Sequence, residues 1–190
     1  SATSTNLTRN GNCCGTSHPD NCVSFEIKLD TGSIGINFEI ASGAIPSGSM
    51  FYQVNCGPQI PVGNTICVSG SGSKYLTFCK PGTNTNTYRV TAIPKPYIPH
   101  DDTTRAGCSL PLQLLGFDPT TVHITSISPG PVGAYDSLLS CTSNCLNPIF
   151  KPNTSTPGMI EYYICGYPGA EQNKCGYLLT VCDTLRLYTM

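Results

Sequence analysis

The chain has 190 residues, of which only 11% are charged, and its formal net charge is −1. So few Lys and Arg residues exclude a basic surface that gathers nucleic acid, and no apolar run reaches the roughly 18 residues that span a bilayer. Twelve cysteines against three histidines, with no C-x₂-C pair, favour disulfides over zinc. Composition therefore predicts a disulfide-bonded protein of an oxidising compartment, extracellular or at the cell surface, with no metal and no cofactor.

The first half of the chain, after a polar N-terminal arm, predicts a series of short strands. Cys22–Leu29 alternates, with Ile27 and Leu29 on one face and Glu26 and Lys28 on the other, which is the period of a half-buried strand. A turn at 30–32 then leads to a second alternating run, and the two runs predict a hairpin. The further strands that Gly, Pro and Ser turns separate are 34–40, 50–54, 65–68, 74–79 and 87–93.

Residues 94–104 predict a boundary between two domains. The segment has three prolines within six residues, followed by Asp101 and Asp102, and resembles a semi-rigid linker. Two neighbouring carboxylates suit calcium, but no calcium-binding loop motif surrounds them, so a solvated linker is the favoured interpretation. Six cysteines precede the segment and six follow it, so each half could close its own bridges. We expect domains over residues 1–98 and 99–190.

The second half continues the same pattern and shows no sustained 3.6-residue period. Residues 137–141 allow either a short helical turn or a strand. The final residues, CDTLRLYTM, end within a strand pattern, so we expect the second domain to be truncated at its C-terminal end. The fold class that follows is all-β, with two tandem disulfide-bonded β-sandwich domains. The strands expected in this half are 110–115, 122–127, 160–165, 177–181 and 184–188.

All twelve cysteines are predicted to form disulfides. Cys13 and Cys14 are adjacent and cannot easily bond to each other, so each is expected to reach a different strand. Six cysteines allow fifteen connectivities in each half, and the sequence does not choose among them. The predicted disulfide cysteines are Cys13, Cys14, Cys22, Cys56, Cys67, Cys79, Cys108, Cys141, Cys145, Cys165, Cys175 and Cys182.

Candidate ligand-binding residues are few. Most of the ten tyrosines fall inside predicted strands, whereas Tyr97, Tyr135 and Tyr167 lie in turn-like contexts where an aromatic face could stack on a sugar. His123 falls on the polar side of its strand and is expected to face solvent. No G-x-S-x-G elbow is present, and the eleven Asp and Glu residues mostly stand alone, so no catalytic residue is predicted.

Several segments resemble the Cys-rich modules of large surface proteins of Bacteroidota that the type IX secretion system exports. The resemblance covers roughly residues 12–189, and its most specific parts are NCCG, YQVNCG, LTFCKPG-N-x-N-x-Y and ISPG…YDSLLSC. These proteins include gliding-motility adhesins with tandem PKD- or Ig-like repeats. The resemblance implies Ig/PKD-like sandwiches on a cell-surface filament, with neighbouring domains or subunits of the same filament as partners. It also implies an adhesive or structural role without catalysis.

The resemblance further implies O-glycosylation, because Bacteroidota modify the hydroxyl of Asp-[Ser/Thr]-X tripeptides. The matching acceptors are Thr103, Ser137 and Thr184. The function expected from the sequence is therefore a structural or adhesive module of an extracellular filament. One alternative is a carbohydrate-binding tip domain with glycans as partners, and a more remote one is a secreted hydrolase domain, which would need two carboxylates in one cleft.

Overall fold

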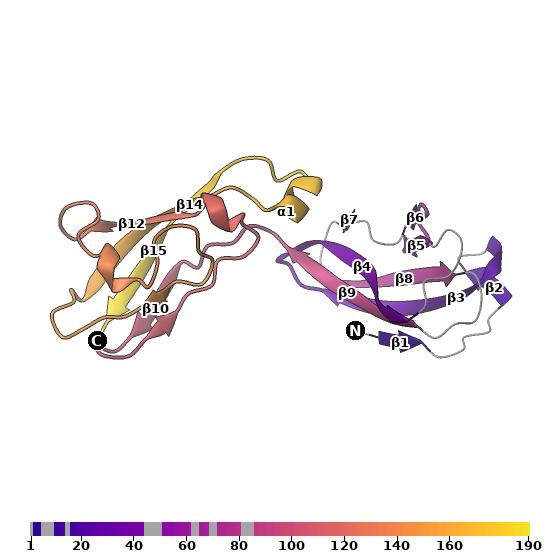
Figure 1. The fold of residues 1–190 in the computed structure, drawn as a ribbon, viewed down its shortest axis with the longest axis horizontal. Helices are drawn as coiled ribbons and strands as arrows, with labels where there is room; N and C mark the ends of the chain where they lie inside the picture. The colour runs from indigo at the N-terminus through magenta and orange to yellow at the C-terminus, as the bar shows by residue number, and fades with distance from the viewer. Residues whose placement is uncertain are drawn as a thin grey trace. The chain divides into compact units, whose positions relative to one another are not determined.

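The structure is a computed structural model that describes residues 2–4, 10–13, 16–43, 51–61, 65–68, 72–80 and 86–190. Its internal contacts divide the chain into a first unit, Ser1–Ile93, and a second unit, Pro94–Met190. Figure 1 shows the order of the elements along the chain. We describe each unit by itself.

The segment that the sequence analysis treats as a linker belongs to the second unit. Tyr97 forms a β-bridge with Leu115, and Ile98 lies in the core with 4% exposure. Gly116 has a φ of +74°, and a Cβ there would lie 3.0 Å from the backbone nitrogen of Pro96, so only glycine fits this close approach. The prolines thus stiffen a stretch that packs on its own unit, and the linker interpretation is wrong.

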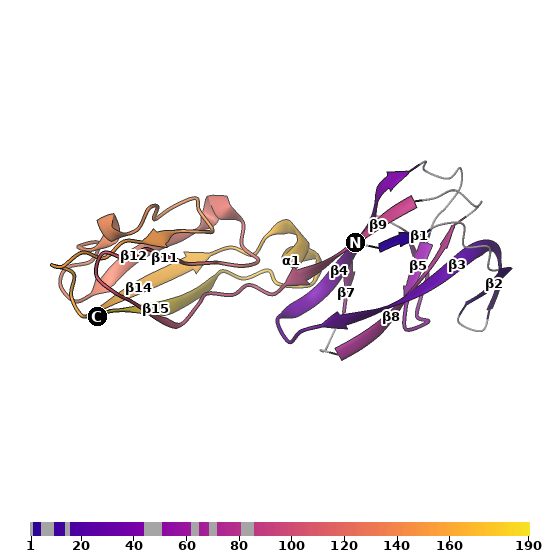
Figure 2. The same ribbon diagram turned by 90° about the horizontal axis from the view of Figure 1, so that it is seen from below.

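The first unit is built from two sheets. One sheet has the order β2-β3-β8-β5-β6 and the other the order β1-β9-β4-β7 (Figure 2). The strands are β1 (Ala2–Ser4), β2 (Asn10–Cys13), β3 (Thr16–Leu29), β4 (Ser33–Gly43), β5 (Phe51–Val54), β6 (Ile60–Pro61), β7 (Thr65–Cys67), β8 (Gly72–Lys80) and β9 (Asn86–Pro94).

Both sheets of the first unit contribute to one core. Phe38 from β4 lies 5.0 Å from Phe78 of β8 and 5.4 Å from Tyr52 of β5, measured between ring centroids. Tyr88 of β9 completes the aromatic cluster, 4.5 Å from Phe78. Because these rings come from facing sheets and are fully buried, the first unit is a β-sandwich.

The strand order in this sandwich is that of an immunoglobulin-like fold. Strands β3, β8 and β5 lie side by side as strands B, E and D do, and β4 and β9 as C and F do. Consecutive strands β3 and β4 therefore belong to opposite sheets, which corrects the expected hairpin. The Asp30 carboxylate accepts from the Gly32 backbone N–H at 3.0 Å and fixes the turn between them.

The second unit has a four-stranded sheet, β10-β15-β14-β12, and a short ladder, β11-β13. Strand β10 pairs in parallel with β15, and the other pairings are antiparallel. The elements are β10 (Asp101–Thr104), β11 (Leu110–Pro111), η1 (Pro119–Thr121), β12 (His123–Ser128), η2 (Asp136–Leu138), β13 (Ile149–Phe150), β14 (Met159–Gly166), α1 (Ala170–Lys174) and β15 (Val181–Thr189).

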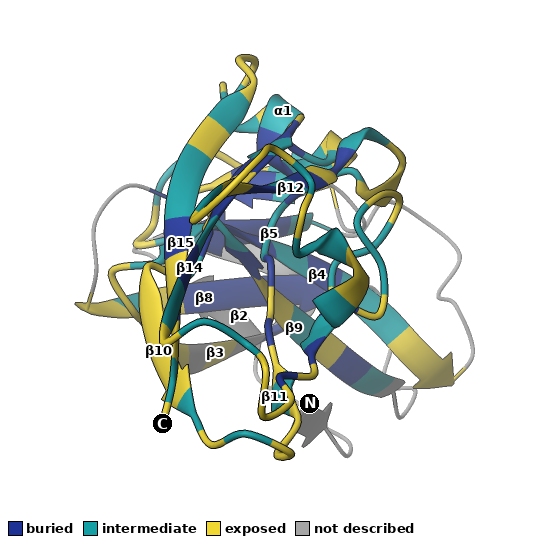
Figure 3. Ribbon diagram, turned by 90° about the vertical axis from the view of Figure 1, so that its left-hand side faces the viewer, coloured by how far each residue is buried: buried dark blue, intermediate teal, exposed yellow. Residues whose placement is uncertain are grey.

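The core of the second unit lies on one face of its sheet. Ile160, Tyr162 and Ile164 alternate inward along β14, and Leu185 and Leu187 do so along β15. The short ladder and irregular segments cover this face, while the opposite face meets solvent, and β10 is largely exposed (yellow in Figure 3). The second unit is therefore one half-buried sheet with a loop-rich cover.

Two sequence predictions need correction in this unit, and one open alternative is decided. The expected strand 110–115 is a regular strand only over Leu110–Pro111, with an isolated bridge at Leu115, because the Leu112 and Leu114 amides donate to irregular segments at Pro148 and Leu146. The expected strand 177–181 is loop up to the start of β15, and it follows a helix, α1, that was not predicted. The region 137–141 takes the helical alternative, as the turn η2. The all-β, disulfide-bonded sandwich class is confirmed.

Candidate functional site

Two disulfides join residues that face each other directly on neighbouring strands. Cys22 of β3 pairs with Cys79 of β8 in the strand register and is bonded to it. Cys165 of β14 likewise pairs with Cys182 of β15 and is bonded to it. The first bond is buried, with exposures of 1% and 0%, whereas Cys182 is exposed. Each bond links two strands of one sheet rather than the two layers of a sandwich.

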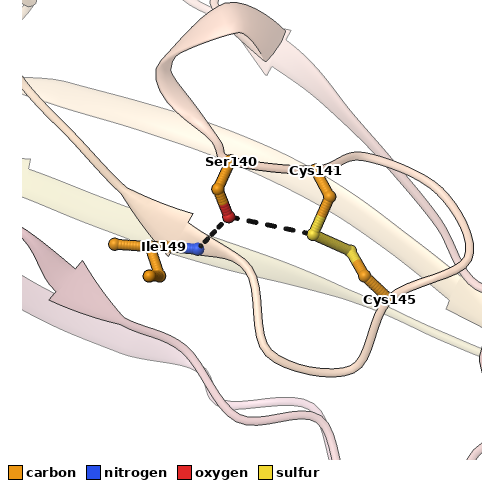
Figure 4. The surroundings of a disulfide bond; sticks show 4 residues. All are labelled: Ser140, Cys141, Cys145 and Ile149. Atoms are coloured by element: carbon orange, nitrogen blue, oxygen red, sulfur yellow. Dashed lines mark hydrogen bonds between the residues drawn. A yellow bond between two sulfur atoms is a disulfide. The ribbon is translucent and has the colours of Figure 1, made fainter.

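A third disulfide closes a small loop between Cys141 and Cys145, four residues apart (Figure 4). Ser140 next to it accepts a hydrogen bond from the Ile149 N–H at 2.9 Å and donates its hydroxyl to the Cys141 sulfur at 3.8 Å. The loop lies against β12, since the Ile124 N–H donates to the Thr142 carbonyl.

The remaining six cysteines fall into three groups. Cys56, Cys67 and Cys175 are also disulfide-bonded. Cys14 lies outside the described residues, and Cys13 is described only as part of the β2 backbone. Cys108 departs from the prediction, because it is an exposed free thiol in the turn after β10 while Cys141 and Cys145 bond each other.

The solvent face of the second unit's sheet carries a row of charged side chains. The Arg186 guanidinium donates to Glu161 at 2.9 Å across β15 and β14, and its other end lies 3.9 Å from Asp101 on β10. The hydrogen bond to Glu161 and then the charge of Asp101 raise the pKa of Arg186. The row spans three strands but is exposed, so water screens it and its contribution to stability is small.

The tyrosines that the sequence singled out lie at separate places. Tyr135 packs against the core beside η2, where its N–H donates to Ser126 near the end of β12. Tyr167 lies beyond the opposite end of that strand, where its N–H donates to Thr121 and its hydroxyl to the Leu178 carbonyl. A six-residue strand is about 17 Å long, so Tyr135 and Tyr167 do not form one platform.

Tyr97 is 43% exposed, and its ring packs edge-on against His100 with centroids 6.3 Å apart. His100 in turn lies 3.5 Å from the Asp183 carboxylate. The Tyr97 ring is thus accessible to solvent, but it already packs against His100. His123 is exposed on β12, as expected.

A hollow on the first unit was missed from the sequence. It has a volume of about 590 Å³ and is lined by Ser24, Asn55, Cys56, Ser73, Tyr75 and Thr77. Tyr75 is 57% exposed, its N–H donates to the Asn55 side chain at 2.9 Å, and Ser73 donates to Glu26 at 2.6 Å. Tyr75 was read as one of the strand tyrosines. Tyr75 lies between Lys74 and the buried Leu76, so alternation along β8 places its side chain on the outward face. This alternation is the sequence signal that could have identified Tyr75.

A second hollow of about 370 Å³ in the same unit is lined by Ile60, Ile66 and Val68, with Asn55 and Lys74 among its other lining residues. Asn55 lines both hollows, but the hollow around Tyr75 also has the hydroxyls and the open aromatic face that can bind a polar ligand with ring faces.

The three predicted glycosylation acceptors differ in exposure. Thr103 is exposed on β10 and Ser137 is exposed in η2, whereas Thr184 is half-buried on β15. Asp102 and Asp183 each accept from the backbone N–H of the following threonine at 2.7 Å. Asp136 instead accepts from the Ser126 N–H at 2.6 Å.

Two features are missing from the described residues. No group of three or more His, Cys, Asp or Glu side chains in that part of the chain could hold a metal ion. None of the helices in those same ranges is long and apolar enough to cross a membrane.

Comparison with known proteins gives a distant structural similarity. No family model matches the chain, and no curated protein matches it. Among solved structures, the tandem Ig domains A164-A165 of titin match with a TM-score of 0.34 and 9% sequence identity, over 89% of this chain and 88% of that chain. This similarity is too distant to assign the fold, which the strand pairing and the two cores define.

Proposed function

We propose that the chain is a structural and adhesive module of an extracellular, cell-surface filament, with neighbouring domains or subunits of the same assembly as its partners. The observation that carries this proposal is the pair of disulfides across directly opposed strands. A pull on the ends of a unit acts on the hydrogen bonds between strands, and a covalent bond between two strands stops their separation.

The proposal predicts a specific response to force. Cys22 and Cys79 are 57 residues apart, so their bond withholds about 200 Å of extended chain. Cys165 and Cys182 are 17 residues apart, and their bond withholds about 60 Å. Pulling on single molecules by their ends should give short extensions in the oxidised protein and extensions longer by these two lengths after reduction. Equal extensions in both states would exclude a load-bearing role for the two bonds.

The hollow around Tyr75 supports a second candidate function, the binding of a neutral saccharide. An exposed tyrosine ring can stack on a pyranose, while the Ser73 and Asn55 side chains lie near enough to bond its hydroxyls. Titration calorimetry with neutral oligosaccharides, on the parent protein and on Tyr75→Ala, tests this candidate. Tyr97→Ala serves as the matched control in the other unit. If Tyr75→Ala leaves saccharide binding unchanged, the binding site is not the hollow around Tyr75.

O-linked sugar belongs to the same proposal. Thr103 and Ser137 are exposed enough to accept it, and Thr184 is less so. Mass spectrometry of the protein from its native host, with Thr103→Ala and Ser137→Ala variants, would assign the modified hydroxyls. Peptides of unmodified mass at all three positions would show that none of these hydroxyls carries sugar.

A further inference from the structure

One disulfide of the second unit has a histidine beside it. Cys165 of β14 pairs in the strand register with Cys182 of β15 on one side and with His123 of β12 on the other. The side chains of register partners lie on the same face of a sheet, with Cβ atoms about 4.5–5.5 Å apart. His123 and Cys182 are exposed, and Cys165 is half-buried. The three side chains therefore form a row across the solvent face of the sheet.

The cross-strand disulfide of the first unit has different surroundings. Cys22 and Cys79 are 1% and 0% exposed, and the register partner of Cys79 on its other side is Phe51. A phenyl ring cannot donate a hydrogen bond to a departing sulfur, whereas an imidazole can, in its neutral and in its protonated form. Of these two bonds, Cys165–Cys182 is the one that combines access from solvent with a neighbouring donor.

The strands leave one end of this bond open. A thiolate attacks a disulfide in line with the sulfur–sulfur bond, from the side opposite the departing sulfur. Beyond Cys165 that line meets His123 on β12. Beyond Cys182 the neighbouring strand β10 has not begun, because its first residue, Asp101, pairs with Arg186 further along β15. Attack is therefore expected at Cys182, and Cys165 is the sulfur that leaves.

We propose that Cys165–Cys182 is an exchangeable disulfide, at which an exposed thiolate attacks Cys182 while the His123 imidazole stabilises the departing Cys165 sulfur. A bond forms between the attacking sulfur and Cys182, the bond from Cys182 to Cys165 breaks, and the Cys165 thiolate takes a proton from water. One thiol is consumed and one is released, so the step needs no oxidant or reductant. This goes beyond the proposed structural role, because it gives the chain a site of covalent attachment that does not depend on load.

The attacking thiolate has two sources of the same chemistry, a small thiol of the glutathione class and the exposed free thiol Cys108 of a second copy. Cys182 lies near the start of β15, whereas the Ala106 N–H, close to Cys108, donates to the carbonyl of Met190 just after its end. The nine residues of β15 span about 30 Å, so Cys108 does not reach Cys182 of its own chain. Exchange through Cys108 would join copies head to tail, a contact that propagates instead of closing as a twofold dimer.

The first experiment uses reduced glutathione as the attacking thiol on the unaltered chain. The mixture is quenched in acid after short times, alkylated with N-ethylmaleimide and mapped without reduction. Glutathione should appear on Cys182 and maleimide on Cys165 while the buried Cys22–Cys79 bond stays intact. First adducts on Cys165 overturn the proposal, and so do adducts that form faster on the Cys141–Cys145 bond than on Cys182.

Variants at His123 separate its hydrogen bonding from its packing. His123→Ala removes the donor and should slow glutathione attachment to Cys182 roughly three- to tenfold. His123→Gln keeps an N–H donor and should hold the rate within about twofold of the parent. Ile127→Ala, at another exposed position of β12, is the matched control and should leave the rate unchanged. Looser packing would open the bond and speed the exchange, so an unchanged or faster rate in His123→Ala overturns the proposal.

The second experiment separates the two sources of thiolate. The chain is concentrated without added thiol, quenched in acid and run on non-reducing gels beside Cys108→Ser. A ladder of covalent species that contains a Cys108–Cys182 peptide pair, and that Cys108→Ser lacks, would identify a second copy as the source. A chain that stays at 20.2 kDa but takes glutathione on Cys182 would identify a small thiol as the source. A chain that does neither overturns the proposal.

Discussion

The two units bury their cores by different means. In the first, two sheets face each other across an aromatic cluster in which Phe38 contacts Tyr52, Phe78 and Tyr88. In the second, one sheet packs under irregular segments, and its largest buried aromatics are Phe150 and Tyr162, 6.2 Å apart. A sandwich of two sheets needs no special loop chemistry, whereas a loop-covered sheet depends on side-chain bonds that hold its loops in place.

The disulfides of the two units differ in burial and in what they hold together. In the first unit the Cys22–Cys79 bond is buried, although it lies on the face of β3 and β8 that carries Ser24 and Thr77, away from the hydrophobic core. In the second, the Cys165–Cys182 bond lies on the solvent face of the sheet and the Cys141–Cys145 bond fixes a loop. The comparison teaches that a cross-strand bond on the outer face of a sheet is buried in one unit and open to solvent in the other.

The largest expected effect comes from removing the cross-strand bonds. Cys22→Ala/Cys79→Ala should lower the free energy of unfolding of the first unit by about 4 kcal/mol, because a loop of 57 residues is released in the unfolded chain. Cys165→Ala/Cys182→Ala, with a loop of 17 residues, should cost the second unit about 3 kcal/mol. Denaturant titration measures both. A larger loss on removing Cys165–Cys182 than on removing Cys22–Cys79 would contradict this ranking of the two bonds.

The next effect tests how the loops of the second unit are held. Asp136 accepts from the Ser126 N–H and lies 3.3 Å from the Thr125 hydroxyl, so Asp136→Ala should cost about 2 kcal/mol. Asp118→Ala, which removes an exposed cap from η1, is the matched control and should cost about 1 kcal/mol. Thermal unfolding provides the measurement. Equal losses would show that the hydrogen bond from Ser126 to Asp136 stabilises the unit no more than the exposed cap at Asp118 does.

Alkaline pH should destabilise both units through their buried tyrosines. Burial raises the pKa of Tyr52 and Tyr162 above the usual 10.0, and the charge of Asp136 adds to the shift at Tyr162. The stability is fully present below pH 10 and falls as pH rises above it, because the unfolded chain then loses phenol protons that the folded chain keeps. The slope is about 1.4 kcal/mol per pH unit for each tyrosine. Tyr162→Phe should remove one such contribution, as urea titrations from pH 9 to 11.5 would show.

The smallest effect is expected on the exposed charge row. Arg186→Met breaks the pairs with Glu161 and Asp101, but the guanidinium is exposed and screened, so the unfolding midpoint should move little at low salt and not at all at high salt. A large, salt-independent loss would mean that the solvent face of this sheet contributes more to stability than the loops do.

Much of the strand framework could be predicted from the sequence. Alternation with period two places Ile36 and Phe38 in one core and Tyr162 and Ile164 in the other, because the side chains of a strand point to opposite faces whatever the strand pairs with. The high cysteine content, together with the absence of metal-site spacing, likewise predicted oxidised sulfur. These properties depend on near neighbours in the chain.

The remaining features depend on contacts between distant residues. The sequence could not show that Cys22 meets Cys79, that Cys108 is left as a thiol, or that Ile98 belongs to the second core. Alternation marks Tyr75 as an outward residue, but it could not show that a hollow lies against this side chain. Strand order and the path of each loop decide these outcomes, because they set which residues come together, and local alternation carries no record of that choice.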